Sequence, residues 1–185
     1  MTMSKSVLII VANGSEELEA VTVIDLLRRA QVDVTVASLD GDPVTCSRGV
    51  KLIPDSSLQD VMQQNFDLIV LPGGLPGADH LADDERVIAL LQQQAKQQRL
   101  TAAICAAPKV LVKAGVVKDK TITGYPGAIK LSENDQVTLT EQAVCEDGLI
   151  VTSRGPGAAM DFALTLIERL AGKEARDTVE LPLKR

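Results

Sequence analysis

The chain has 185 residues, of which 45% are hydrophobic and 24% charged, and its formal net charge is -6. An acidic excess has the wrong sign for binding phosphates, and one Tyr, two Phe and no Trp leave few rings for base stacking. These numbers exclude a disulfide-stapled scaffold, a collagen-like fibre and a disordered tail. They predict a single domain over residues 1–185 with an aliphatic core.

The number of cysteines and the length of the apolar runs indicate the cellular compartment of the protein. Cys46, Cys105 and Cys145 are too few, and odd in number, for a stapled secreted fold, which favours a reducing environment. No apolar run approaches the roughly 20 residues of a membrane helix. We therefore expect a cytoplasmic protein without a membrane or a nucleic acid as a stable partner, in which one cysteine is present for its reactivity.

Short apolar runs that end in Gly or Pro alternate with longer segments of helical period, as in parallel strands joined by crossover helices. The predicted strands are 7–12, 32–39, 66–71, 100–104 and 149–153, with two short ones within 44–53 and loose β segments between 118 and 148. The predicted helices are 15–30, 84–99, 108–114, one ending near 171, and a polar helix or arm at 173–185. The pattern predicts a flavodoxin-like doubly wound α/β fold, with a mainly parallel sheet and helices on both faces.

The first predicted helix has apolar residues at helical spacing and acidic residues at its start. Leu18, Val21, Ile24 and Leu27 recur with the helical period. Glu16 and Glu17 fall in the first turn, where the simplest interpretation is that they stabilise the positive end of the helix dipole.

Four segments follow predicted strands, where ligands bind in open α/β sheets: 13–17, 72–77, 105–108 and 154–157. Cys105 is the outstanding residue, because a cysteine at a strand-to-helix junction lies beside unpaired backbone N–H groups that favour the thiolate. A buried, inert cysteine is the commoner alternative. The small neighbours Ala103 and Ala106 favour the reactive interpretation, since a sharp turn that carries a nucleophile tolerates little bulk.

Other chemistry has weaker signals. The Gly73-Gly74 pair is either ordinary turn chemistry or a source of oxyanion-binding amides. His80, the sole histidine, is more simply a solvated loop residue than the partner of a cysteine nucleophile. Nucleotide-binding glycine motifs are missing, and one His with three dispersed Cys gives no metal-ligand spacing, so we expect neither a cofactor nor a metal.

Five motifs, in order along nearly the whole chain, resemble the DJ-1/ThiJ/PfpI superfamily, and most closely its DJ-1 branch, which includes bacterial YajL-like proteins. The motifs are Gly14-Ser15-Glu16-Glu17-Leu18-Glu19, Cys46-Ser47-Arg48, Leu71-Pro72-Gly73-Gly74, Ala102-Ala103-Ile104-Cys105-Ala106-Ala107-Pro108 and Thr152-Ser153-Arg154-Gly155-Pro156-Gly157.

The resemblance implies a role for each matching residue. Cys105 matches the family's oxidation-prone nucleophile, and Glu17 matches the glutamate that hydrogen-bonds it, usually as a protonated acid. The backbone positions around the sulfur match Gly73, Gly74 and Ala106. Arg48 and Arg29 match residues near the rim of the site and the dimer contact, and a homodimer is implied.

One position departs from the family, and two cysteines have simpler interpretations. Where many members have a histidine after the cysteine, this chain has Tyr125, a poor base near neutrality that can still orient a substrate or donate a proton. This argues against a protease. Core or interface packing is the better interpretation of Cys46, and Cys145 has only a structural one.

The resemblance leaves three functions open. The first is cofactor-independent detoxification of reactive carbonyls in the oxidative and carbonyl stress response: glyoxalase III-type conversion of methylglyoxal or glyoxal to a hydroxy acid, or deglycation of proteins or nucleotides. The second is a redox sensor or chaperone in which Cys105 is oxidised to a sulfinate. The third is a cysteine hydrolase or amidotransferase, which requires a histidine near Cys105. The expected partner is a small aldehyde or glycated substrate.

Overall fold

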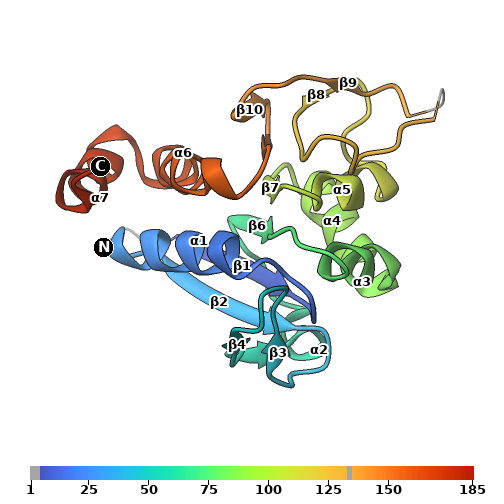
Figure 1. Ribbon diagram of the computed structural model, residues 1–185, viewed down its shortest axis with the longest axis horizontal. Coiled ribbons are helices and arrows are strands. Elements are labelled where there is room, and N and C mark those ends of the chain that lie inside the picture. The colour runs from blue at the N-terminus through green and yellow to red at the C-terminus, as the bar shows by residue number, and fades with distance from the viewer. Residues whose placement is uncertain (1–4, 133–134) are drawn as a thin grey trace.

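The computed structural model describes residues 5–132 and 135–185, so 1–4 and 133–134 of the predicted domain lie outside it. A seven-stranded sheet forms its centre (Figure 1). Its strands, in spatial order, are β10 (Val144–Asp147), β11 (Ile150–Ser153), β7 (Leu100–Ile104), β6 (Leu68–Leu71), β1 (Ser6–Val11), β2 (Asp33–Ser38) and β5 (Ser56–Ser57). Every pair is parallel except β10–β11. This confirms the predicted mainly parallel α/β fold.

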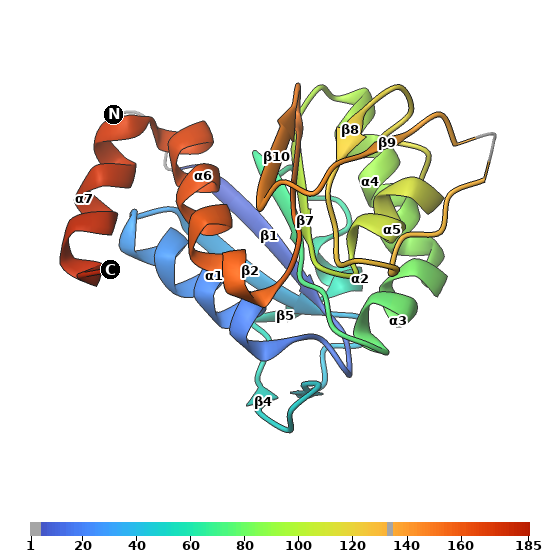
Figure 2. The same cartoon turned by 45° about the horizontal axis from the view of Figure 1, so that its top comes forward.

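Helices cover both faces of the sheet (Figure 2). One face carries α1 (Glu17–Arg29), α6 (Ala159–Ala171) and α7 (Lys173–Leu183). The other carries α2 (Leu58–Val61), α3 (Gly77–Asp83), α4 (Glu85–Lys96) and α5 (Pro108–Lys113). In the described part of the chain no helix is long and apolar enough to cross a membrane.

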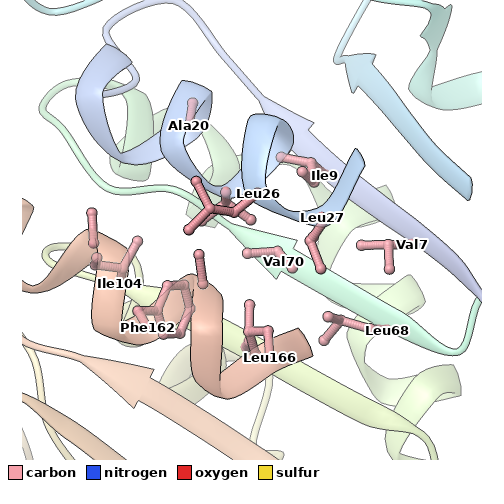
Figure 3. Close-up of a cluster of buried hydrophobic side chains, with 14 of the residues drawn as sticks. Val7, Ile9, Ala20, Leu26, Leu27, Leu68, Val70, Ile104, Phe162 and Leu166 are labelled. Carbon is pink, nitrogen blue, oxygen red and sulfur yellow. The ribbon is translucent and has the colours of Figure 1, made fainter. Parts of the chain in front are cut away.

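The core has two layers because successive side chains of a strand point to opposite faces. Val7, Ile9 and Val11 of β1 pack under α1 and α6, where Phe162 is fully buried (Figure 3). The alternate residues of β1 face the layer of α3, α4 and α5. Both faces of the strand are therefore apolar, which explains its unbroken hydrophobic run.

The remaining elements are short. β3 (Val44–Thr45) and β4 (Lys51–Leu52) form a hairpin, as the two short strands within 44–53 predict. β8 (Thr121–Ile122) pairs with β9 (Thr138–Leu139), and a 3-10 turn, η1 (Pro156–Ala158), precedes α6. β5, α2 and α3 have no counterpart among the predicted elements, and His80 lies in α3 rather than in a loop.

α1 has two apolar faces. Ala20, Val23 and Leu26 are buried against the sheet layer. Leu18 and Val21, two of the residues whose spacing predicts the helix, are exposed instead. The face of α1 that meets the sheet is therefore not the face that Leu18 and Val21 suggest.

The sheet order gathers the four predicted site segments. β11, β7, β6 and β1 are consecutive neighbours, so the segments that follow their carboxyl ends lie along one edge of the sheet. The direction of winding reverses between β1 and β6, which is where α/β proteins bind their ligands. The fold thus places Cys105, at the end of β7, next to the segment that follows β6.

Candidate active site

Cys105 lies in a sharp turn between β7 and α5 and has a left-handed backbone, with φ of 64°. Its N–H donates to the carbonyl of Ser153 at 2.8 Å, and its carbonyl accepts from the N–H of Tyr125 at 2.7 Å. A side chain at positive φ is strained, and such strain persists only where the surroundings hold it. These two bonds hold the turn, and the residue is only 8% exposed.

The carboxyl beside Cys105 belongs to Glu19. Glu19 lies in the first turn of α1 and is fully buried, and its Oε2 accepts from the N–H of Gly73 at 2.8 Å. The carboxyl also hydrogen-bonds the Cys105 thiol. Its Oε1 is buried without an N–H or O–H partner among the described residues, which disfavours the ionised form.

Two acidic groups in one buried site cannot both ionise easily. Burial raises the pKa of Glu19 to about 7, repulsion from Glu16 adds to this, and the hydrogen bonds from Gly73 and Cys105 oppose it. Burial and the Glu19 charge raise the pKa of the Cys105 thiol to about 12. The two groups therefore titrate as a pair that loses its first proton near neutrality and keeps its second.

Two backbone amides stabilise negative charge on the sulfur. The N–H groups of Gly74 and Ala106 hydrogen-bond Cys105 and lower the pKa of its thiol, against the effect of burial. Both residues are among those that the resemblance to the family places around the sulfur. Gly73 is different, because its N–H is committed to the Glu19 carboxyl and is not available to bind an oxyanion.

Gly73 is required for a steric reason. A Cβ on this residue would lie 2.6 Å from the Cys105 Cβ, 2.8 Å from Glu19 Oε2 and 2.8 Å from the carbonyl oxygen of Ile104. Only a residue without a side chain lets the strand end, the thiol and the carboxyl come this close.

We predict that Gly73→Ala lowers the free energy of unfolding by roughly 1–3 kcal/mol, as overpacking does, and slows alkylation of Cys105. Denaturant unfolding and iodoacetamide labelling followed by mass spectrometry measure the two effects. Gly157→Ala is the matched control, since a Cβ there meets nothing within 4 Å. Equal stability of the two variants would contradict the close packing described above.

The prediction that Glu17 hydrogen-bonds Cys105 is wrong. The Glu17 carboxylate turns away and accepts from the Ser47 hydroxyl at 3.1 Å and from the N–H groups of Arg48 at 2.9 Å and Val50 at 3.3 Å. Partial burial raises the pKa of Glu17, but these hydrogen bonds outweigh it and the net shift is downward. Glu17 is thus an ionised anchor for the β3–β4 hairpin.

Helix geometry gives the physical reason for this correction. Glu17 and Glu19 are two residues apart, about 200° around the helix, so only one of them can face the sheet. Glu19 shares its face with the buried Val23 and Leu26, which lie four and seven residues further on. That spacing is the signal in the sequence that could have identified Glu19.

Tyr125 is held next to the cysteine turn through its backbone. Besides the hydrogen bond to the Cys105 carbonyl, its ring lies over Gly155, where an added Cβ would meet it at 3.4 Å. Tyr125 and Arg154 line two adjoining cavities of about 340 and 460 Å³. Tyr125 is 54% exposed, so a substrate-binding role at this rim remains a prediction.

The two predicted arginines lie apart. Arg48 is exposed in the β3–β4 turn, and its N–H binds Glu17 near the start of α1. Arg29 is in the last turn of α1, about 15 Å along the helix from Glu19, and pairs with Asp25 at 2.8 Å. This distance removes Arg29 from the rim of the thiol site, and its dimer contact remains a prediction.

The other thiols and the histidine do not form a catalytic pair with Cys105. Burial and the charges of Glu17 and Glu16 raise the pKa of Cys46 to about 11, and the Cys145 thiol donates to the Thr121 carbonyl at 3.4 Å. His80 Nδ1 lies 2.9 Å from the Asn13 carbonyl oxygen, so its contact gives no support to a Cys–His mechanism. In the described ranges, no three His, Cys, Asp or Glu side chains are grouped so that they could hold a metal ion.

The fold and the site define a class: α/β proteins with a buried thiol and a carboxyl paired near the switch point of a parallel sheet. Comparison with known proteins defines the family. The model of the DJ-1/PfpI family matches residues 5–169. The chain belongs to this family.

Several of its relatives match over almost their whole length. The chain is 47% identical over 173 residues to protein dj-1beta of Drosophila melanogaster, covering 93% of this chain and 92% of that protein. It is 44% identical to the Parkinson disease protein 7 homolog of Danio rerio, covering 97% and 96%. The crystal structure of Drosophila melanogaster DJ-1beta superposes with a TM-score of 0.93 at 44% identity and covers 98% of each chain. These relatives support the DJ-1 assignment, and the YajL-like branch stays a prediction.

Proposed function

We propose that this protein converts small reactive carbonyl compounds, such as methylglyoxal and glyoxal, to hydroxy acids without a cofactor. The observation that carries the proposal is the buried Cys105–Glu19 pair, with the Gly74 and Ala106 amides at the sulfur. A relative in Caenorhabditis elegans, 36% identical over 99% of this chain and 98% of its own length, is named glutathione-independent glyoxalase DJR-1.2. This name supports the same class of reaction.

The proposed reaction needs only a nucleophile and one carboxyl. The Cys105 thiolate attacks the aldehyde carbon of methylglyoxal, and the oxygen takes the Glu19 proton to give a hemithioacetal. The Glu19 carboxylate then removes the hydrogen of that carbon as a proton and returns a proton to the neighbouring carbonyl carbon. The hydroxyl proton of the first carbon passes to the oxygen of the neighbouring carbon, which leaves a lactyl thioester. Water hydrolyses the thioester to lactate and frees the thiol. The first carbon is oxidised and the second reduced, so no external oxidant is required.

The charge of the bound intermediates develops next to two amides that are already oriented. The Gly74 and Ala106 N–H groups hydrogen-bond the sulfur, and we propose that they also stabilise the oxygen that becomes negative during attack. Gly73 contributes by fixing Glu19. Tyr125, at the rim, replaces the histidine of other members as a residue that orients the substrate.

Turnover of methylglyoxal without glutathione tests the proposal. We expect the wild type to form lactate and Cys105→Ala to form it no faster than buffer. Equal rates for the two proteins would refute the enzymatic function. A glycated peptide from which free aldehyde has been removed then separates a deglycase, which releases the amine directly, from an enzyme that consumes only the free aldehyde.

A redox sensor or chaperone is the second candidate, because the same amide N–H groups can donate hydrogen bonds to the oxygen atoms of a Cys105 sulfinate. A structure titled Toxoplasma gondii DJ-1, oxidized, has a TM-score of 0.92 at 40% identity and covers 98% of each chain. After mild peroxide treatment, peptide mass spectrometry should find oxygen on Cys105 first. Earlier oxidation of Cys46 or Cys145 would exclude this role.

We further propose a homodimer through the exposed apolar face of α1 and the adjacent hairpin. Val21 is 44% and Ile53 83% exposed, and both line a groove between α1 and β4. Val21→Asp places a charge where a second copy would bury it, so the dimer dissociation constant should rise at least about a hundredfold. Sedimentation equilibrium measures this. A monomeric wild type, or a variant as dimeric as the wild type, would contradict the prediction.

A further inference from the structure

Three hydrogen bonds form a closed ring around the start of α1. The Glu16 carboxylate, at the N-cap, accepts from the Glu19 N–H at 2.8 Å. The Glu19 carboxyl accepts from the Gly73 N–H at 2.8 Å, and the Gly73 carbonyl accepts from the Glu16 N–H at 2.9 Å. Each of the three residues is therefore fixed by the other two.

We propose that Glu16 is the positioning residue of the Cys105–Glu19 pair: it holds the Glu19 carboxyl against the thiol and keeps a fixed negative charge beside it. The inference rests on the proposed function in one respect only, because that function gives the Cys105–Glu19 pair its catalytic role. Glu16 touches neither the sulfur nor a reacting atom, so its effect is exerted through Glu19.

The cap residue itself favours this role. Ser, Thr, Asp and Asn are the usual N-caps because their short side chains reach the first free N–H groups. Glu16 caps the helix with a longer side chain, and the hydrogen-bond ring that includes Gly73 holds this side chain in place. What Glu16 adds over a neutral cap such as Ser is a charge within the first turn, close to a buried carboxyl.

The groups that act on the pair come from three elements. Gly73 faces Glu19 from the segment after β6, Cys105 faces it from the β7–α5 turn, and Glu16 faces it from the N-cap of α1. The Cys46 thiol of the β3–β4 hairpin lies near Glu16 and Glu17 and stays protonated near neutrality, because burial raises its pKa to about 11. Repulsion from Glu16 raises the pKa of Glu19, so removing that charge should make the pair ionise at lower pH.

The experiment measures the rate of Cys105 alkylation by iodoacetamide against pH, site by site with mass spectrometry, because this readout needs no substrate turnover. Glu16→Gln keeps an acceptor for the Glu19 N–H and removes the charge, and Glu16→Ala removes both. Asp25→Asn removes an exposed carboxylate from the same helix, where it pairs with Arg29, and serves as the control.

We expect the midpoint of alkylation to fall by about half a pH unit in Glu16→Gln and to stay unchanged in Asp25→Asn. In Glu16→Ala we expect kcat for methylglyoxal to fall about tenfold or more, and Glu16→Gln to recover it to within about threefold of the wild type. A Glu16→Gln midpoint equal to that of the wild type, or a Glu16→Ala variant with wild-type kcat, overturns the proposal. A wild type that alkylates as expected but does not turn over methylglyoxal refutes the proposed function instead, and the midpoint shift alone then decides the role of Glu16.

Discussion

Glu19→Gln is expected to lower kcat/KM for methylglyoxal at least about a hundredfold, whereas Glu17→Gln should stay within about threefold of the wild type. The amide that replaces the Glu19 carboxyl can still accept from the Gly73 N–H, so the site keeps its shape, but it cannot carry a proton between two carbons. Glu17 serves the hairpin through Ser47, Arg48 and Val50, and its side chain does not face the thiol.

The two variants control for each other, because each replaces one carboxylate in the first turn of the same helix with an amide. Lactate formation in glutathione-free buffer, with circular dichroism to verify folding, measures the difference. Loss of activity in Glu17→Gln together with retained activity in Glu19→Gln would reverse the assignment made from the structure.

Glu19→Gln should also make the protein more stable at pH 8, by roughly 3 kcal/mol in the free energy of unfolding. The pKa of Glu19 is raised from 4.5 to about 7 in the folded protein. A carboxyl with a raised pKa binds its proton more tightly in the folded protein, so the bound proton stabilises the fold. This stabilisation is fully present below pH 4.5 and is lost as the pH rises through 7. The wild type therefore carries the cost of a buried charge at pH 8, and the neutral amide of the variant does not.

Urea unfolding at about pH 8 and about pH 4 tests this linkage. The advantage of the variant should be largest at the higher pH and small at the lower one, where Glu19 is protonated in the folded chain and mostly protonated in the unfolded chain. A variant less stable than the wild type at the higher pH would mean that Glu19 is paired in a way that favours its ionised form. The expected result, an inactive protein that is more stable, is typical of residues kept for chemistry rather than for folding.

The sequence predicts the sheet well because its signals are local. β7 matches the predicted strand 100–104, and Pro108 begins α5 as its fixed φ suggests. Cys105 could be placed at a strand end from these two elements alone. The short β5 and α2 are absent from the predicted elements because two to four residues are too few to show a period.

The choice between Glu17 and Glu19 depends on which side of α1 meets the sheet, and the sequence is ambiguous there. Leu18 and Val21 supply a second apolar stripe that predicts the helix but not its buried face. A pattern with two apolar stripes is expected where one packs in the core and the other meets a partner. The spacing of Glu19 with Val23 and Leu26 is one of the two stripes that the sequence offers, and the tertiary packing shows that this stripe lies on the core side.

The rate of Cys105 alkylation by iodoacetamide against pH in the wild type tests the central claim most directly. If Cys105 and Glu19 share a proton, the alkylation rate should rise through a midpoint near pH 7, where the pair first becomes an anion. This step should disappear in Glu19→Gln. A rate that rises only above about pH 9, as for an isolated buried thiol, or a step that persists without Glu19, would contradict the pairing of Cys105 with Glu19.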